Sequence, residues 1–294
     1  MKRNVLHKIV SKYALNYSKY IKNDESYLKL KYWGMMGKKL DLTNPKTYNE
    51  KLQWLKLHDR REEYTTMVDK FLVKDYVSKK IGERYVIPLL GVWDNFEEIN
   101  FDLLPNRFVL KCTHDSGGLI ICKNKSLLNI SEARKKINKS MKNNYFLEGR
   151  EWPYKNVKPR IIAEVYMEDT TDKALRDYKF FAFDGEVKAL FIATDREKDY
   201  VETKFDFFDR NFEHLDFRNG HPNAAVQPRK PRNYEEMVHL AQILSKGIPQ
   251  VRIDFYEVNG RVYFGEITFY HWSGMVPFEP DEWDYKFGEW IKIL

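Results

Sequence analysis

Charged residues stand inside two otherwise apolar segments near the C-terminus, and this feature constrains the fold most. Arg252 and Asp254 interrupt the first segment, and Glu266 interrupts the second. The dipeptide Asn259-Gly260 between them is typical of a tight β-turn, so the segments are predicted to pair as a hairpin. A buried charge is costly unless it is paired or bound to a metal ion. The hairpin therefore indicates either a functional site or a structural ion pair between Arg252 and Glu266.

The two carboxylates of this hairpin suit a magnesium ion, which takes hard oxygen ligands and often shares them with phosphate. Strand register tests the idea. With a two-residue turn at Asn259-Gly260, Asp254 faces Gly265, and Glu266 points to the opposite side of the sheet. The carboxylates can then meet only if the loop holds an odd number of residues or a β-bulge shifts the pairing. We predict such a departure.

The rest of the chain predicts helices and antiparallel strands. Periodicity and turn signals place helices over residues 1–32, from near Thr47, and over 64–80, 131–144 (with Ser131 as N-cap) and 234–246. Strands are predicted over 85–93, 108–112, 119–122, 160–167, 178–195 and 251–270. Pro88 suits an edge strand. The expected class is α+β with mainly antiparallel sheets.

Composition narrows the functional class. Fifty basic residues exceed 43 acidic ones, giving a formal charge of +7, which is a weak sign of an anionic partner. Aromatic residues such as Phe180 and Phe181 have strand-like spacing, which favours a packed core over a base-stacking surface, so no nucleic-acid partner is expected. Cys112 and Cys122 lack zinc-site spacing and are typical of a reducing compartment. Without a long apolar run or a signal-peptide core, the sequence predicts a cytoplasmic protein.

The N-terminal segment is basic and partly amphipathic. Val5, Ile9 and Tyr13 alternate with Lys and Arg residues. Such a helix either caps the domain as a solvated surface or lies on the anionic inner face of a membrane. Both interpretations stay open on the sequence alone.

A second constellation combines Lys111 with the loop Ser116-Gly117-Gly118 that follows its strand. Glycines let backbone N–H groups approach phosphate oxygens, and a neighbouring lysine supplies positive charge. The pattern is not a Walker motif, and taken alone it is a weak signal, because a glycine loop after a strand is far more often an ordinary turn.

A third constellation lies on the strands that follow. Glu164 interrupts the apolar run 161–167, whose backbone can contact an adenine edge, although a strand Glu with a lysine partner is equally ordinary. Asp177 and Lys179 share one face of the next strand by period two, and Lys179 can reach a nucleotide phosphate from there.

The order of these parts resembles the ATP-grasp superfamily, and specifically the TupA-like group associated with teichuronopeptide and capsular polysaccharide biosynthesis. Together the matching segments run from about residue 30 to the C-terminus. They are Asn44–Lys51, Asp69-Lys70 with Lys74, Val109–Lys111, Asp177–Phe181, Val251–Asp254 and Tyr263–Tyr270.

The resemblance implies an ATP-grasp fold, in which two α+β lobes with mainly antiparallel sheets clamp a nucleotide. The corresponding division is a helical N-terminal extension (1–65), a first lobe with the lysine strand and glycine loop (66–160) and a second lobe with the metal-binding hairpin (161–294). The implied cofactors are ATP and Mg²⁺.

The resemblance also implies roles for individual residues. Nucleotide contacts are expected from Lys74, Lys111, Ser116, Gly117, Gly118, Glu164, Val165, Tyr166 and Met167. The implied metal ligands are Asp254, Glu266 and Thr268, and the implied catalytic residues are Arg252, Lys179 and Arg196. Two positions depart from the family pattern. Thr268 stands where an Asn ligand is common, and Asp115 stands where a glycine is expected, so it must turn away from phosphate or pair with His114.

The implied reaction joins a carboxylate to an amine through an acyl phosphate, with an amino acid or amine and a uronic-acid-containing polymer or precursor as partners. His271 and Ser273 follow the metal strand and are candidates for orienting substrate or for a structural loop. Two alternatives remain. A glycosyltransferase would use an Asp-x-Asp motif, to which Asp206–Asp209 is the nearest approximation, and a degenerate fold would serve as a non-catalytic scaffold.

Overall fold

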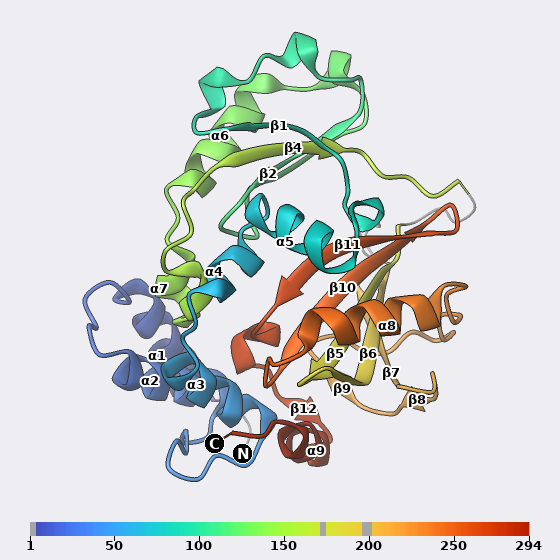
Figure 1. The fold of residues 1–294 in the computed structure, drawn as a ribbon. Helices are drawn as coiled ribbons and strands as arrows, with labels where there is room; N and C mark the ends of the chain where they lie inside the picture. Colours follow the sequence, from blue (N-terminus) through green and yellow to red (C-terminus); the bar gives the residue numbers. More distant parts are fainter. Residues whose placement is uncertain (1–3, 171–174, 196–201, 294) are drawn as a thin grey trace.

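A computed structural model describes residues 4–170, 175–195 and 202–293 of the chain (Figure 1). Within these residues the strands form a four-stranded sheet of order β1-β4-β2-β3, a six-stranded sheet of order β11-β10-β5-β6-β7-β8 and the short pair β12-β9. All of these pairs are antiparallel, so the predicted α+β class is confirmed. The strands are β1 (Leu89–Trp93), β2 (Phe108–Cys112), β3 (Leu119–Cys122), β4 (Ile161–Val165), β5 (Asp177–Phe183), β6 (Glu186–Thr194), β7 (Lys204–Asp209), β8 (His214–Leu215), β9 (Arg218–Asn219), β10 (Val251–Val258), β11 (Arg261–Thr268) and β12 (Phe278–Glu279).

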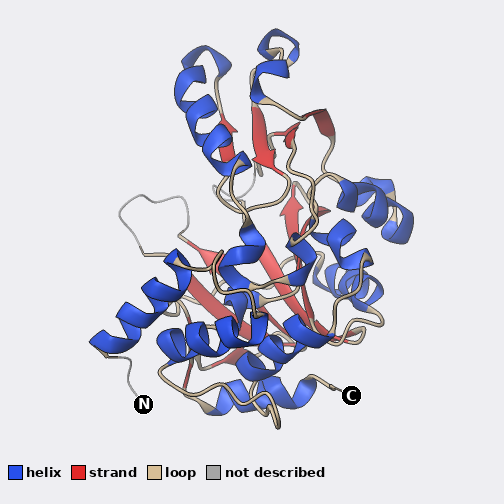
Figure 2. Cartoon of the chain, turned by 90° about the vertical axis from the view of Figure 1, so that its left-hand side faces the viewer, coloured by secondary structure: helices blue, strands red, loops and turns tan. Residues whose placement is uncertain are grey.

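The helices surround these sheets. They are α1 (Val5–Asn16), α2 (Asp24–Met36), α3 (Tyr48–His58), α4 (Glu63–Val68), α5 (Leu72–Ile81), α6 (Ile130–Met141), α7 (Tyr145–Gly149), α8 (Tyr234–Ser245) and α9 (Glu282–Trp290). Among the short 3₁₀ turns, η6 (His271–Gly274) follows β11 directly. Figures 1 and 2 show the four-stranded sheet with α6 at one end of the molecule and the larger sheet with most of the helices at the other.

Capping explains where the N-terminal helices begin and end. Thr47 caps α3 in a capping box with Glu50, which confirms the predicted start. The helix expected over 64–80 is instead two helices, because the Asp69 carboxylate accepts hydrogen bonds from the backbone N–H groups of Phe71 (2.8 Å) and Leu72 (3.2 Å). The segment 1–32 likewise contains two helices. Helix α6 is capped by Asn129, so our choice of Ser131 is wrong.

Strand alternation decides which side chains of the small sheet face the larger one. Phe108 and Leu110 of β2 are buried with Ala133 and Ile137 of α6 in one hydrophobic core. Because side chains alternate along a strand, Lys111 projects from the opposite face, toward the six-stranded sheet. The predicted lysine strand therefore presents its amine to the space between the sheets. Strand β1 lies at an edge of this sheet, as expected from Pro88.

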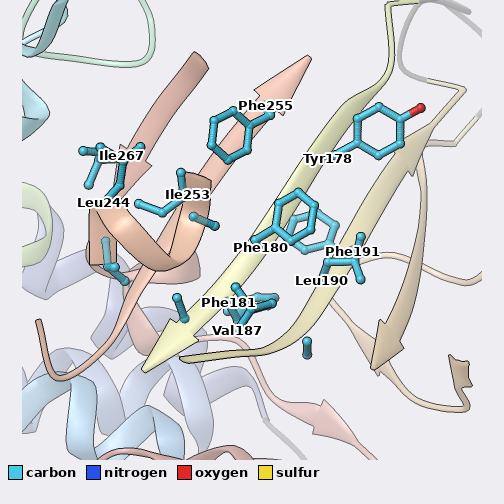
Figure 3. Close-up of a cluster of buried hydrophobic side chains, with 14 of the residues drawn as sticks. Tyr178, Phe180, Phe181, Val187, Leu190, Phe191, Leu244, Ile253, Phe255 and Ile267 are labelled. Atoms are coloured by element: carbon cyan, nitrogen blue, oxygen red, sulfur yellow. The ribbon is translucent and has the colours of Figure 1, made fainter. Parts of the chain in front are cut away.

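The six-stranded sheet is covered on both faces. All residues of β5 are buried. Phe180 on β5 and Ile253 on β10 join Leu244 of α8 in a hydrophobic cluster (Figure 3). On the other face, Phe181 contacts the ring of Phe287 from α9 at a centroid distance of 5.3 Å. Asp177 and Lys179 share this second face with Phe181 by alternation, and the register places Arg252 and Asp254 of β10 opposite Phe181 and Lys179.

The hairpin of β10 and β11 contains the predicted β-bulge. Val258 pairs with Arg261 across the two-residue turn, whose residues both have positive φ. The register then shifts by one at Gly265, so that Asp254 lies directly opposite Glu266. A Cβ at Gly265 would lie 3.1 Å from the backbone oxygen of Asp254, which suits glycine at the extra position. The bulge turns both carboxylates to one face of the sheet.

Hydrogen bonding divides the chain differently from our sequence boundaries. Strand β4 follows residue 160 and was expected to open the second lobe, yet it pairs with β1 and β2 in the small sheet. Helix α5, expected in the first lobe, contacts α8, which packs on the large sheet, and α4, at the expected boundary, contacts β11. Strand β4 therefore lies inside the small sheet, hydrogen-bonded to a strand on each side. The chain passes from the first lobe to the second only after Val165.

Candidate functional site

A small cavity of about 30 Å³ lies where the two sheets and α5 meet. Its polar lining comes from α5 and its preceding loop (Lys70 and Lys74), from β2 and β4 (Lys111 and Glu164) and from β11 (Glu266). This space holds about one water molecule, so a nucleotide requires the lobes to separate or the side chains to move. A larger cavity of about 780 Å³ lies elsewhere, around Tyr178, Arg229 and Glu257, beside the segment that precedes α8. None of the predicted nucleotide or metal residues lines it.

Glu164 bridges two lysines on the small-sheet side of the cavity. Its carboxylate lies 2.5 Å from Lys74 Nζ and 2.5 Å from Lys111 Nζ. Lys74 also donates to the Ile87 carbonyl oxygen at 2.8 Å. Burial alone would raise the pKa of the Glu164 carboxyl, but the two ammonium groups hold it below its ordinary value. The predicted phosphate lysines are thus brought together, and in this state their counter-charge is a protein carboxylate.

The glycine loop is closed by Asp115, which turns into the protein. Its carboxylate accepts a hydrogen bond from Gly118 N at 3.1 Å and another from the Ser140 hydroxyl. The partner is therefore Ser140 rather than His114, whose Nε2 lies 3.1 Å from the Ser140 carbonyl oxygen. Ser116 and Gly117 remain exposed at the tip. Since the Asp115 charge is directed inward, its presence does not oppose phosphate at the tip of the loop.

Lys70 connects this loop to the metal hairpin, and our sequence reasoning gave it no role. Lys70 Nζ donates to the Asp115 carbonyl oxygen at 2.6 Å and lies 4.0 Å from Glu266 Oε1. The sequence did offer one indication of a role for Lys70, because Asp69-Lys70 is one of the segments that resemble the ATP-grasp family. The position of Lys70 adds a third amine, after Lys74 and Lys111, to the lining of the cavity.

A buried charge network occupies the facing surface of the large sheet. Arg252 donates to both carboxylate oxygens of Asp254, from Nε at 2.7 Å and from Nη2 at 2.8 Å. Lys179, on the neighbouring strand, contacts the same carboxylate and lies 2.6 Å from Asp177. Burial would raise the pKa of Asp254, but Arg252 and Lys179 lower it, so Asp254 is ionised. The network joins three of the residues predicted to act in catalysis or metal binding.

Glu266 stands at the open edge of this network. Its side chain is 39% exposed, and its Oε2 lies 4.0 Å from Arg252 Nη2. Thr268 accepts a hydrogen bond from Arg252 Nη2 at 3.0 Å and donates to Glu266 at 3.4 Å. Arg252 and Glu266 therefore form only a long ion pair of 4.0 Å, and the close partner of Arg252 is Asp254 at 2.7 Å. Glu266 keeps oxygens available to the cavity.

The oxygen donors of the hairpin fit a hard cation. Asp254 and Glu266 lie opposite each other on one face, with Thr268 beside them. A carboxylate has about four lone-pair sites, and Arg252 and Lys179 use three of those on Asp254. In the described part of the chain no group of three His, Cys, Asp or Glu side chains is already arranged around a metal position. The hairpin thus offers two carboxylates and a hydroxyl, which are the oxygen types that a hard cation prefers.

His271 extends the network beyond Arg252. Its Nδ1 accepts from Arg252 Nη1 at 2.8 Å, so its Nε2 carries the proton and donates to Asn219 Oδ1 at 3.0 Å. Burial, with Arg252 and Lys179 adding to it, lowers the pKa of His271 well below its ordinary value. His271 is thus a neutral side chain that positions Arg252.

Other predicted residues lie outside the cavity lining. Val165 ends β4, and Tyr166 stacks under the Arg107 guanidinium at 5.4 Å from the ring centroid. Neither they nor Met167 are among the lining residues of the small cavity. Arg196 lies outside the described residues. The Asp206 carboxylate, considered for a glycosyltransferase motif, is buried and accepts hydrogen bonds from the Ala224 backbone.

Comparison with known proteins identifies the family. A family model described as TupA-like ATPgrasp matches residues 50–292. No curated protein matches the chain. Among solved structures, the D-alanine–D-alanine ligase of Helicobacter pylori aligns with a TM-score of 0.45 and 16% identity, over 83% of this chain and 69% of that one.

Two further structures give similar values. The D-alanine–D-alanine ligase of Bacillus anthracis, complexed with ATP, aligns with a TM-score of 0.41 and 15% identity, over 69% of this chain and 54% of that one. The ATP-grasp ligase PsnB, complexed with its minimal precursor, Mg and ADP, has a TM-score of 0.39 and 10% identity, over 87% and 66%. This chain spans about half the length of the Bacillus anthracis ligase.

The family match extends from the first turns of α3 to α9 and includes every residue of the cavity. It confirms the resemblance that the sequence motifs carry. This chain belongs to the TupA-like ATP-grasp family, and its fold is of the α+β class.

Proposed function

We propose that this protein is an ATP- and Mg²⁺-dependent carboxylate–amine ligase that forms an amide through an acyl phosphate. One observation carries the proposal. Three lysines, Lys111 of the small sheet and Lys70 and Lys74 from α5 and its preceding loop, line a common space with Glu266 of the carboxylate-bearing hairpin. Positive charge on one side and metal-binding oxygens on the other is what a nucleotide triphosphate with its cation requires.

The chemistry needs positioning and charge neutralisation rather than a protein nucleophile. A substrate carboxylate oxygen attacks the γ-phosphorus of ATP, and ADP leaves. The amine then attacks the acyl carbon, phosphate leaves, and the amine gives up its proton as the amide forms. Arg252, which bonds Asp254 and His271, would stabilise charge on the transferring phosphoryl group. Lys74 and Lys111 would hold phosphate oxygens by releasing Glu164.

The cation would be held by Asp254 and Glu266, with Thr268 as a weaker third donor. When bound, it neutralises phosphate charge and fixes the reacting oxygens. Lys179 would balance the charge on Asp254 from the neighbouring strand.

For the substrates, we propose an amino acid or amine and a uronic-acid-containing cell-surface polysaccharide or its precursor. The support is the TupA-like family match together with a site that can activate a carboxylate. A glycosyltransferase is disfavoured because the Asp206 carboxylate is buried and bonded to backbone. A scaffold remains the alternative that the following experiment separates.

Titration with a non-hydrolysable ATP analogue tests the proposal. Wild-type protein should bind the analogue more tightly with Mg²⁺ than without it. Glu266→Gln should lose this Mg²⁺-dependent increment and stay folded, because the side chain is 39% exposed and its nearest cations are 4.0 Å away. Glu282→Gln, on the exposed first turn of α9, is the matched control and should behave like wild type. Absence of analogue binding under every condition would leave the scaffold or the glycosyltransferase.

We further propose that α1 docks the enzyme on the anionic inner face of the cytoplasmic membrane. Val5, Ile9, Tyr13 and Tyr17 recur every four residues and are between 48% and 73% exposed, while Ala14 packs on the opposite side. Exposed lysines at positions 8, 12 and 19 flank this stripe. Apolar and aromatic side chains bordered by lysines suit a helix that lies in a lipid interface. No helix in the described residues is long and apolar enough to cross a bilayer.

Vesicle co-sedimentation tests this placement. Wild-type protein should sediment with phosphatidylglycerol vesicles at low salt and less with phosphatidylcholine vesicles, because lysines are attracted to anionic lipid. The double variant Ile9→Ser, Tyr13→Ser should bind the vesicles at least about tenfold more weakly, since two apolar contacts are lost. Leu127→Ser removes an even more exposed apolar side chain (81%) elsewhere and should have no effect. Undiminished binding of the double variant would contradict the proposal.

A further inference from the structure

The turn η6 holds consecutive residues in left-handed backbone conformations. Trp272 (φ 50°, ψ 27°) and Ser273 (φ 56°, ψ 16°) precede Gly274 (φ 61°). Left-handed backbone is costly for residues with a side chain and persists only where surrounding structure imposes it. The turn follows the strand that carries Glu266 and Thr268, so this strain lies directly beside the proposed site.

Two buried side chains of α3 impose this conformation. Gln53 Nε2 donates to the carbonyl oxygens of Ser273 (3.0 Å) and Gly274 (2.8 Å). Lys56 Nζ donates to the Ser273 carbonyl oxygen and to its hydroxyl, both at 2.8 Å. Burial lowers the pKa of the Lys56 amine to about 7, with Glu151 opposing the shift. Burying an amine costs free energy, and two of the hydrogen bonds that Lys56 makes here go to the strained turn, while a third goes to Gln53 Oε1 at 3.0 Å.

The consequence of the strained turn is the position of the Trp272 ring. The indole rests against Gly220, where a Cβ would lie 2.8 Å from Nε1. Phe205 stacks nearly parallel to it, with 6.1 Å between centroids and 24° between planes, and His221 lies 5.9 Å away. Although it is packed on this side, Trp272 is 41% exposed. An aromatic ring is therefore supported from behind and left open to solvent.

This ring lies next to the residue that positions Arg252. Phe205 lies 4.5 Å from Phe191, and the Arg252 guanidinium lies 5.6 Å from the Phe191 ring centroid. His271, which bonds Arg252, is the neighbour of Trp272 in the turn. A ligand on the exposed part of Trp272 would therefore lie near the Arg252 network, one residue along the turn from His271.

We propose that Trp272 is the platform on which the sugar ring of the carboxylate substrate stacks. A pyranose has one apolar face of C–H groups and a polar rim, which matches an open indole bordered by His221. An acyclic amino acid has no such face and gains nothing from a supported flat ring. The inference rests on the proposed ligase function, because it places the ring beside the site that activates its carboxylate.

Saturation-transfer difference NMR with D-glucuronate and digalacturonate tests the platform. In wild-type protein the C–H protons of one sugar face should receive saturation. Trp272→Ala should weaken sugar binding about three- to tenfold, which is the range of an aromatic contact. Trp272→Phe keeps a flat ring and should retain most of the binding. Tyr285→Ala removes an exposed ring on α9 (49% exposed) and should change nothing.

Binding of the ATP analogue is measured on the same samples and separates the two proposals. If Trp272→Ala binds the analogue like wild type and loses the sugar, the platform is supported. If it binds both as wild type does, or if wild type binds the analogue and neither sugar, the platform is wrong while the ligase proposal stands. If wild type binds no analogue, the ligase proposal fails and the platform built on it fails too.

Discussion

Asp254→Asn is expected to abolish turnover and to destabilise the protein by about 3–5 kcal/mol, because it removes one partner of a buried charge network. Asp254 is 1% exposed. Its carboxylate accepts hydrogen bonds from Nε and Nη2 of Arg252 and also contacts the amine of Lys179. The amide keeps the shape but leaves two cations without their common counter-charge. Because Arg252 loses its orientation, the rate of phosphate release should fall at least about 10²-fold.

Urea unfolding measures the loss of stability, and phosphate release measures the loss of activity.

The pH dependence of the unfolding free energy tests whether the Asp254 charge causes the loss of stability. The folded-state pKa of Asp254 lies below the ordinary value of 3.8, so its stabilising contribution is present above about pH 3.8 and is lost as the pH falls through the folded pKa. The difference in unfolding free energy between wild type and variant should therefore narrow in acid. Asp216→Asn, an exposed carboxylate, is the control, and equal stability of Asp254→Asn and wild type at neutral pH would contradict the network.

Glu164→Gln is expected to lower the free energy of unfolding by about 3–5 kcal/mol in the nucleotide-free protein. Glu164 is 6% exposed, and its carboxylate is the shared partner of Lys74 and Lys111. In the variant these amines face each other without a negative charge. A non-hydrolysable ATP analogue should then raise the melting temperature of the variant more than that of wild type, because phosphate oxygens supply the missing charge.

Thermal unfolding with and without the analogue distinguishes two roles for Glu164. The resemblance assigns it to the adenine and ribose pocket, whereas the structure shows it between the lysines. Unchanged stability combined with lost analogue binding would favour direct contact with the nucleotide. Glu168→Gln breaks an exposed pair with Arg107 and should cost no more than about 1 kcal/mol.

Local sequence patterns predicted the α+β fold class, the strand that carries Lys111 and the shape of the hairpin that carries Asp254 and Glu266. Period-two alternation alone places Lys111 opposite the buried Phe108 and Leu110. The bulge at Gly265 followed from the requirement that Asp254 and Glu266 share a face, since a one-residue shift is the smallest change that achieves it. These inferences succeed because they depend on the geometry of neighbouring residues.

The sequence does not show which residues form ion pairs or hydrogen bonds with one another across the fold. Nothing local shows that Glu164 bridges Lys74 and Lys111, that Asp115 turns toward Ser140, or that Lys56 supports a turn more than 200 residues away. The same limit explains the lobe boundary, because the hydrogen bonds of β4 go to strands before it in the chain.

The sequence by itself determined which residues carry charge, which face of each strand they occupy and where the chain turns, because dihedral preferences and side-chain alternation act over a few residues. Only the tertiary structure decided which charges meet. Arg252 could pair with Glu266 or Asp254, and close packing of the two strands and η6 selects Asp254 at 2.7 Å while leaving Glu266 at 4.0 Å, available to a cation. Electrostatic energies change steeply with such distances and with burial, and both are set by segments far apart in the chain.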